Sequence, residues 1–308
     1  KLSYSDGKGI SWRRDHRSDY TWDKSIYFTK IVYGNEPGVD VKVPWELSRM
    51  LFLPTVALAA RYTRDEVYVD FIKSTLHDFE RDNPFLYGVN WKCTMDVSIR
   101  LINILVTQDL AEGRLDKSSN DIDMDSLAAK HFLYIIHNLE WVPFNRGNHY
   151  YSNLVGVLAY LRYTKNKDRR LLKRYVSEFL SETSLQFNDD GTNFEASTTY
   201  HCLSFELFTL GYACCRYFIS EVGKLGLDND NLVFAESLES KASKFISDIH
   251  CPEGEILQIG DNDSGYILEL EFDKYDKETL SRNYLDYKHL SEIDGLRLDL
   301  YKSLGLND

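Results

Sequence analysis

Apolar positions recur at intervals of three and four residues through most of the chain between residues 45 and 249. This interval matches the 3.6-residue turn of an α-helix, so the pattern predicts amphipathic helices that each bury one face. We expect them at residues 45–61, 64–81, 91–110, 123–138, 148–163, 168–185, 195–221 and 231–249. A short polar turn at residues 165–168 joins two of them, which is typical of an antiparallel helical hairpin.

The flanking segments lack this pattern. Residues 1–44 are mixed and rich in aromatic side chains, and we interpret them as an irregular N-terminal segment. Residues 45–270 form the predicted helical domain, and residues 271–308 form a charged tail. Repeated helical hairpins without a series of alternating strands predict an all-α fold, either an α/α toroid or a helical solenoid. The sequence shows no self-similarity at a fixed period, which weakens the solenoid alternative.

Composition and charge narrow the classes of function. Hydrophobic residues make up 43% of the 308 residues, enough for a substantial core. The formal net charge of −12 argues against nucleic-acid binding, because neutralising phosphates requires a basic surface. No apolar run is long enough to cross a bilayer, so we expect no membrane insertion. The 21 tyrosines suit a sugar-binding cleft and the packing of a large helical core equally well.

The five cysteines are odd in number, form no Cys-x-x-Cys motif and fall mostly in apolar helical patterns. They therefore predict buried free thiols rather than disulfides or metal ligands. The sequence opens Lys-Leu-Ser without Met, so we expect a fragment or a processed form, in which a missing leader carries no information.

A first polar island interrupts the apolar pattern at residues 148–151. Gly147 breaks the preceding segment, so Asn148 and His149 are expected in the first turn of a helix. The unpaired N–H groups of such a turn favour an anion, for example a carboxylate. The alternative is that Asn148 is an N-cap and His149 a partly buried residue with a local partner.

A second polar island covers residues 190–201, after a turn at residues 188–191. If the helix begins at Glu195, that residue shares a face with Thr199 and Cys202, and Tyr200 and His201 lie about one and a half turns in. The two islands supply an amide, imidazoles, phenols and a carboxylate but no nucleophilic triad, which favours proton abstraction next to a carboxylate. The alternative interpretation makes Tyr200 a core residue and Glu195 a partner of the helix dipole.

Three further motifs have structural or functional interpretations. Trp91, after Asn90, is placed to stack on a sugar ring, and Arg100 falls in an apolar run where its charge needs either Asp96 or a ligand carboxylate. In the N-terminal part of the helical region, Glu46 and Arg49 can pair on one helix. The loop at residues 260–265 has the composition of a calcium loop but not the ligand pattern of an EF-hand, so we predict a tight structural turn and no metal.

In this order, the motifs resemble those of the heparinase II/III-type polysaccharide lyases, including the related alginate lyases. The matching motifs are Trp45-Glu46-Leu47-Ser48-Arg49, Asn90-Trp91 with Met95-Asp96 and Arg100, Asn148-His149, Asp190-Gly191 with Glu195, Ser197 and Tyr200-His201, and Gly260-Asp261-Asn262-Asp263-Ser264-Gly265. The resemblance implies an α/α toroid of antiparallel hairpins whose C-terminal β-sandwich is missing from these residues. Asp96 departs from the pattern, which usually has Glu at that place.

By this resemblance, the catalytic residues are Asn148, His149 and Tyr200, with Asn148 neutralising the carboxylate of a uronate. The substrate-binding residues that it implies are Asn90, Trp91, Arg100, Glu195 and His201. It implies no cofactor in this chain, a structural metal in the missing sandwich, and an acidic polysaccharide or oligosaccharide as the partner. A phenol titrates near pH 10, so as a base Tyr200 needs a basic neighbour such as His201, His149 or an arginine.

The expected reaction is β-elimination in a uronate-containing polysaccharide, in the periplasm or outside the cell. One alternative is a toroid glycoside hydrolase that uses Asp190 or Glu195 together with Asp261 as acid and base. The other is a non-catalytic protein with the same toroid that binds glycans or takes part in an assembly.

Overall fold

The computed structural model describes residues 9–115, 122–143, 147–223, 225–250, 256–262 and 265–268. These residues form α-helices and two short 3₁₀ turns, and among them no strand occurs beyond isolated bridges. The described residues fall into two compact units, one up to Glu140 together with Leu268, and one from Trp141 to Ile267. The predicted tail at residues 271–308, Cys251, and residues 263–264 of the loop lie outside the described residues.

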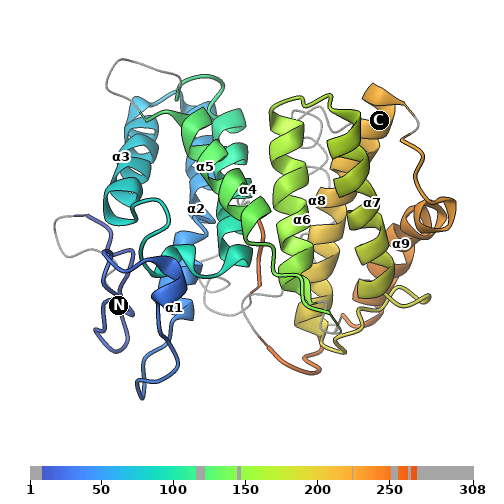
Figure 1. The fold of residues 1–308 in the computed structure, drawn as a ribbon, viewed down its shortest axis with the longest axis horizontal. Coiled ribbons are helices and arrows are strands. Elements are labelled where there is room, and N and C mark those ends of the chain that lie inside the picture. The colour runs from blue at the N-terminus through green and yellow to red at the C-terminus, as the bar shows by residue number, and fades with distance from the viewer. Residues whose placement is uncertain are drawn as a thin grey trace. The chain divides into compact units, whose positions relative to one another are not determined.

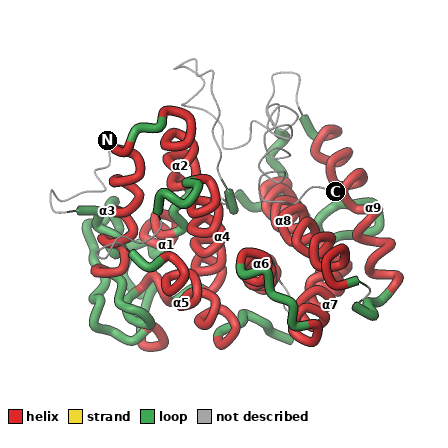
Figure 2. The backbone as a smooth tube through the Cα atoms, turned by 90° about the horizontal axis from the view of Figure 1, so that it is seen from above, coloured by secondary structure: helices red, strands yellow, loops and turns green. Residues whose placement is uncertain are grey.

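The first unit is built around helix α4, Thr94–Leu110, which is buried along nearly its whole length. It packs against α2, Phe52–Thr63, and against α5, Met124–His137, while α2 also contacts α3, Glu66–Asp82 (Figures 1 and 2). A helix buried on all sides must give each of its polar side chains a partner. In α4, for example, the hydroxyls of Ser98 and Thr107 donate to the carbonyls of Thr94 and Asn103.

The predicted helix at residues 45–61 is two helices, α1, Lys42–Ser48, and α2. The chain breaks between them at Met50, whose φ of 60° lies in the left-handed region, and the Met50 side chain is fully buried. Burial of this residue keeps the apolar period intact across the break, so the period alone predicted one helix. The predicted helix at 91–110 likewise begins later, at Thr94, after a 3₁₀ turn at Val89–Trp91.

The second unit contains α6, Asn148–Tyr163, α7, Arg169–Gln186, α8, Thr198–Val222, and α9, Asn229–Asp248. Helix α6 packs against α7 and α8, and α9 packs against α7 and α8 (Figure 1). The short connection between α6 and α7 makes them antiparallel, as the polar turn at 165–168 predicted. Because α7 runs back, α6 and α8 run in the same direction and begin at the same end of the unit.

Polar side chains fix the starts of several helices. Asp65, Asp123, Asp168, Ser197 and Asp228 each accept a backbone N–H in the first turn of the helix that follows. Such caps satisfy N–H groups that have no partner within the helix. The start of α6 differs, because its N-cap is Gly147, which has no side chain to offer.

Among the described cysteines, the prediction of buried free thiols is confirmed for Cys93, Cys202, Cys214 and Cys215. None of the described helices combines the length and the apolar composition needed to span a membrane.

Candidate functional site

The start of α6 is capped from outside by Glu195. Its carboxylate accepts the backbone N–H of Asn148 and lies 3.3 Å (Oε1) and 3.4 Å (Oε2) from Nδ2 of the same residue. The alternative that made Asn148 the N-cap is therefore wrong, since Asn148 is the first helical residue. Asn148 is buried, Glu195 is half-buried, and the side chain of His149 is exposed.

The electrostatics of Glu195 reflect this position. Burial raises the pKa of its carboxyl, whereas the two hydrogen bonds from Asn148 and the nearby imidazole of His149 oppose the rise. The partial positive charge of the helix start also favours the ionised form. The result is a carboxylate held at a site that attracts anions but only partly exposed to water.

A hydrogen-bonded loop between α7 and α8 holds Glu195 in place. Asn193 Oδ1 accepts the backbone N–H of Glu195 at 3.0 Å, and Asn193 Nδ2 donates to the carbonyl of Gln186 at 2.9 Å. The backbone N–H of Asn193 donates to Nδ1 of His201 at 3.2 Å. The loop is thus tied both to the end of α7 and to the first turn of α8.

The side chain of His201 is buried in the protein and is not open to solvent. Its ring is 1% exposed, packs against Phe187, Phe205 and Phe245, and places Nε2 3.3 Å from the carbonyl oxygen of Ala242. With Nδ1 accepting from Asn193, the proton must sit on Nε2, so the ring is neutral. Burial lowers the pKa of His201 to about 4.

The expectations that His201 binds substrate or supplies the positive charge that activates Tyr200 therefore conflict with the structure. Both ring nitrogens face other parts of the protein, and the neutral ring carries no charge near pH 7.

Tyr200 lies in the first turn of α8 and not one and a half turns into a helix. Helix α8 begins at Thr198, and its cap, Ser197, accepts the backbone N–H of Tyr200 at 3.2 Å. Glu195 therefore precedes the helix, which corrects the predicted face shared by Glu195, Thr199 and Cys202. The Tyr200 side chain is half-buried.

A short segment, residues 256–262, crosses the start of α8. Ser197 Oγ donates to the carbonyl of Asp261 at 2.6 Å, and the backbone N–H of Thr198 donates to the carbonyl of Ile259 at 3.0 Å. At Gly260, φ is +73° and an added Cβ would lie 2.7 Å from the carbonyl oxygen of Ala196. The described part of the predicted loop thus acts as a structural support for α8, and only glycine fits at residue 260.

Two carboxylates of the glycoside hydrolase alternative, Asp190 and Asp261, have environments that do not suit an acid and a base. Asp190 Oδ1 accepts both the backbone N–H and the hydroxyl of Thr192, and these bonds lower the pKa of Asp190. A general acid needs a raised pKa, so this environment opposes that role. Asp261 is exposed and meets α8 through its backbone carbonyl.

In the first unit, Trp91 is 2% exposed and belongs to the core. Its Nε1 donates to the carbonyl of Asn83 at 3.3 Å, and its ring packs against Phe85, His131 and Tyr134. The interpretation of Trp91 as a stacking surface for a sugar conflicts with this burial. Asn90 is likewise fully buried, and its Nδ2 donates to Asn83 Oδ1 at 2.8 Å.

Arg100 is also fully buried, at the centre of a polar network. Its Nε donates to His131 Nε2 at 2.9 Å, and its terminal nitrogens donate to Ser48 Oγ at 3.0 Å and to the carbonyl of Asn90 at 3.0 Å. The faces of the Phe79 and Trp91 rings lie 4.7 Å and 5.2 Å from its Cζ. Burial lowers the pKa of Arg100 to about 9.

The expected pair of Asp96 with Arg100 gives way to another pair. Burial opposes the charge of Arg49, but the carboxylates of Asp96 and Glu46 raise the pKa of Arg49. Asp96 Oδ1 binds Nε of Arg49 at 2.6 Å, and both side chains are almost completely buried. Arg100 therefore makes no direct ion pair with Asp96 among the described residues, although the charge of Asp96 still favours its charged form. Neutral hydrogen-bond partners and two aromatic faces contact the guanidinium itself.

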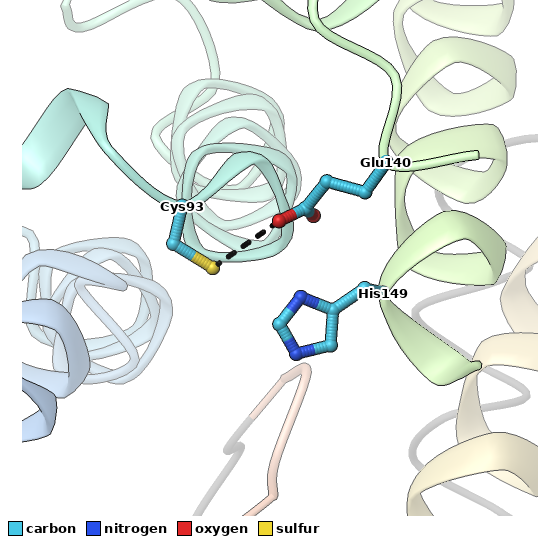
Figure 3. A group of neighbouring side chains, drawn as sticks. All are labelled: Cys93, Glu140 and His149. Carbon is cyan, nitrogen blue, oxygen red and sulfur yellow. Dashed lines mark hydrogen bonds between the residues drawn. The ribbon is translucent and has the colours of Figure 1, made fainter. Parts of the chain in front are cut away.

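A residue that no sequence pattern indicated, Glu140, caps α4 from outside with its carboxylate. Glu140 Oε2 accepts the backbone N–H of Met95 at 2.8 Å, and Oε1 accepts the thiol of Cys93 at 3.8 Å (Figure 3). Burial raises the pKa of Cys93, so the thiol stays protonated. Figure 3 also shows the imidazole of His149, which comes from the first turn of α6. No periodicity marks a carboxylate that caps a distant helix, so the sequence offered no signal for Glu140.

No family model matches the sequence, and no curated protein matches it. Solved structures do match. One is a mutant of the heparan sulfate lyase HepC from Pedobacter heparinus, which is 20% identical to this chain and superposes with a TM-score of 0.51. The match covers 82% of this chain and 37% of the HepC chain. Another is a heparinase III, which is 18% identical with a TM-score of 0.51. The match covers 75% of this chain and 40% of the heparinase III chain.

The HepC lyase without that mutation is 21% identical with a TM-score of 0.50, over 75% of this chain and 36% of its own. This chain therefore spans less than half the length of these lyases. At such identities the likeness shows the fold alone, and it confirms the predicted all-α fold of the α/α-toroid class. The chain thus has a fold like the helical portion of polysaccharide lyases.

Proposed function

We propose that this chain carries part of the active site of a polysaccharide lyase that cleaves a uronate polymer by β-elimination. The observation that carries the proposal is the common placement of Asn148 and Tyr200. They lie in the first turns of two packed helices that run in the same direction, α6 and α8, and the loop that bears Glu195 joins the two starts. The likeness of the fold to heparan sulfate lyases supports it.

The chemistry required is removal of the C5 proton of a uronate, which is weakly acidic because the adjacent carboxylate is already charged. An amide nitrogen carries two N–H groups, so Asn148 can donate one to Glu195 and the other to the substrate carboxylate. With the exposed His149 beside it, this amide stabilises the extra charge of the enolate-like intermediate, by the logic of an oxyanion hole.

Tyr200 then carries out the proton transfers of the reaction. It removes the C5 proton, protonates the leaving glycosidic oxygen, or does both on one face of the sugar. Since His201 is neutral, a positive charge that favours the phenolate of Tyr200 has to come from His149 or an arginine.

The test is to assay the full-length protein for unsaturated, ultraviolet-absorbing products from a panel of heparan sulfate, alginate and other uronate polymers. We expect Tyr200→Phe and Asn148→Ala each to abolish product formation. Two matched controls should retain it. Tyr217→Phe removes a hydroxyl about 25 Å further along α8, and Asn229→Ala changes the first residue of α9. Product formation by both site variants contradicts the proposed roles.

A further inference from the structure

Glu195 places a carboxylate of the protein at the position where the proposed function brings a carboxylate of the substrate. Its oxygens lie 3.3 Å and 3.4 Å from Asn148 Nδ2, and it also accepts the backbone N–H of Asn148. The donors that are proposed to neutralise a uronate therefore already serve an acidic side chain of the protein.

The structure restricts how Glu195 can respond to an incoming anion. Its backbone N–H is bonded to Asn193 Oδ1 at 3.0 Å, and the Asn193 side chain is anchored to the end of α7. Gly147 leaves the start of α6 without a side-chain cap of its own, so moving Glu195 away would leave a helix start unsatisfied. Displacement of Glu195 is thus costly, whereas a change in its protonation leaves these bonds in place.

Two carboxylates that share one set of donors in a partly buried site do not both stay ionised, because their repulsion favours protonation of one of them. Within the second unit, the groups that act on Glu195 are the amide and backbone N–H of Asn148 and the imidazole of His149. One amide and one imidazole compensate at most one negative charge in addition to the helix start.

We propose that Glu195 takes up one proton from solvent when a uronate binds at Asn148, so that a carboxylic acid of the protein faces the carboxylate of the ligand. The inference rests on the proposed function and extends it to proton-coupled recognition. The O–H of protonated Glu195 donates to a uronate oxygen, and its carbonyl oxygen still accepts from Asn148. When the ligand leaves, the proton returns to solvent.

This coupling has a measurable consequence. At pH values at which Glu195 is ionised in the unliganded protein, the Kd for a uronate ligand should rise about tenfold for each unit by which the pH increases. In Glu195→Gln, the neutral amide reproduces the protonated acid, since its oxygen accepts from Asn148 and its nitrogen donates to the ligand. We expect this variant to bind with a Kd that does not change over the pH range in which the Kd of the natural protein rises.

The experiment is titration calorimetry with heparan sulfate oligosaccharides at pH 7, in two buffers of different ionisation enthalpy, on the full-length protein carrying Tyr200→Phe to prevent turnover. The difference between the buffers gives the number of protons taken up. We expect about one proton with Glu195 present, and about none when Glu195→Gln is added. Glu239→Gln, on the exposed side of α9, is the matched control and should not change the uptake.

A second measurement does not depend on the folding of the Glu195 variant. Oligosaccharides whose uronate carboxyls have been reduced to alcohols should bind Tyr200→Phe without proton uptake. Uptake that is absent with the uronate ligand, or that persists in Glu195→Gln or with the reduced ligand, overturns the inference. If product forms but no proton is taken up, the inference alone fails. If no uronate polymer yields product and these oligosaccharides do not bind, the proposed function fails with it.

Discussion

His201 makes the second unit sensitive to acid in a way that can be calculated. Its Nδ1 accepts the backbone N–H of Asn193, which belongs to the loop that holds Glu195, and its Nε2 faces the carbonyl of Ala242 on α9. A proton added to Nδ1 would point at the N–H of Asn193 and break this bond. Protonation therefore separates the loop from the first turn of α8, which carries Tyr200.

The magnitude follows from the pKa in the two states. Burial lowers the pKa of His201 to about 4 in the folded chain, whereas an unfolded histidine titrates near 6.5. Between these values the unfolded state binds more protons, so the free energy of unfolding falls as the pH falls from 6.5 to about 4. At about 1.4 kcal/mol for each unit of pKa, this histidine accounts for a loss of about 3 kcal/mol.

Two measurements test this prediction. Proton NMR of the His201 ring should show no titration above pH 5, roughly one unit above its folded pKa. The free energy of unfolding of the second unit should fall by about 3 kcal/mol more in the natural protein than in His201→Gln between pH 7 and 4. Titration of His201 near pH 6.5, or an unchanged slope in His201→Gln, refutes the reasoning.

Two further substitutions test the packing that positions the site. Asp96→Asn leaves the buried guanidinium of Arg49 without its 2.6 Å partner and should lower the free energy of unfolding by about 3–5 kcal/mol. In contrast, Asp248→Asn, in an exposed ion pair, should change the free energy of unfolding by less than about 1 kcal/mol, as measured by thermal unfolding. Equal losses of stability in the two variants would contradict the argument. Gly260→Ala brings a Cβ to 2.7 Å from backbone and should destabilise the start of α8 by about 1–3 kcal/mol more than Gly38→Ala, which has a similar φ but open space around it. Equal stability of the two glycine variants in chemical denaturation would show that the close approach at α8 is unimportant.

The apolar period predicted most helices of this chain because a buried face leaves a regular trace in the sequence. It failed where a different physical effect sets the boundary. Met50 keeps the period while its backbone leaves the helix, so one predicted helix is two. Glu195 resembles a first-turn acidic residue, but the cap of α8 is Ser197. The Ser-Thr-Thr run at 197–199 is a capping signal that the sequence does offer.

Contacts between distant segments left no such trace. The amide of Asn148 and the carboxylate of Glu195 are 47 positions apart and meet only because α6 and α8 begin at the same end of the second unit. The partner of Asp96 was expected four positions along its own helix but is Arg49, 47 positions away on the chain segment after α1. Helical spacing limits which neighbours on one helix can pair, but it does not show whether a distant residue provides a better partner.

The motifs that carry the resemblance to lyases therefore serve two physical purposes. Asn90, Trp91 and Arg100 are fully buried and bond to one another or to the surrounding core, so their order in the sequence reflects the packing of the first unit. Asn148 lies at a helix start that Glu195 caps from another segment, and Tyr200 lies at one that the adjacent Ser197 caps. A buried polar network constrains residue identity as strictly as catalysis does, because each unpaired group costs about 1–3 kcal/mol. An ordered set of such motifs consequently identifies the fold. Burial and hydrogen-bond partners are needed to distinguish the residues that stabilise this fold from those that can contact a ligand.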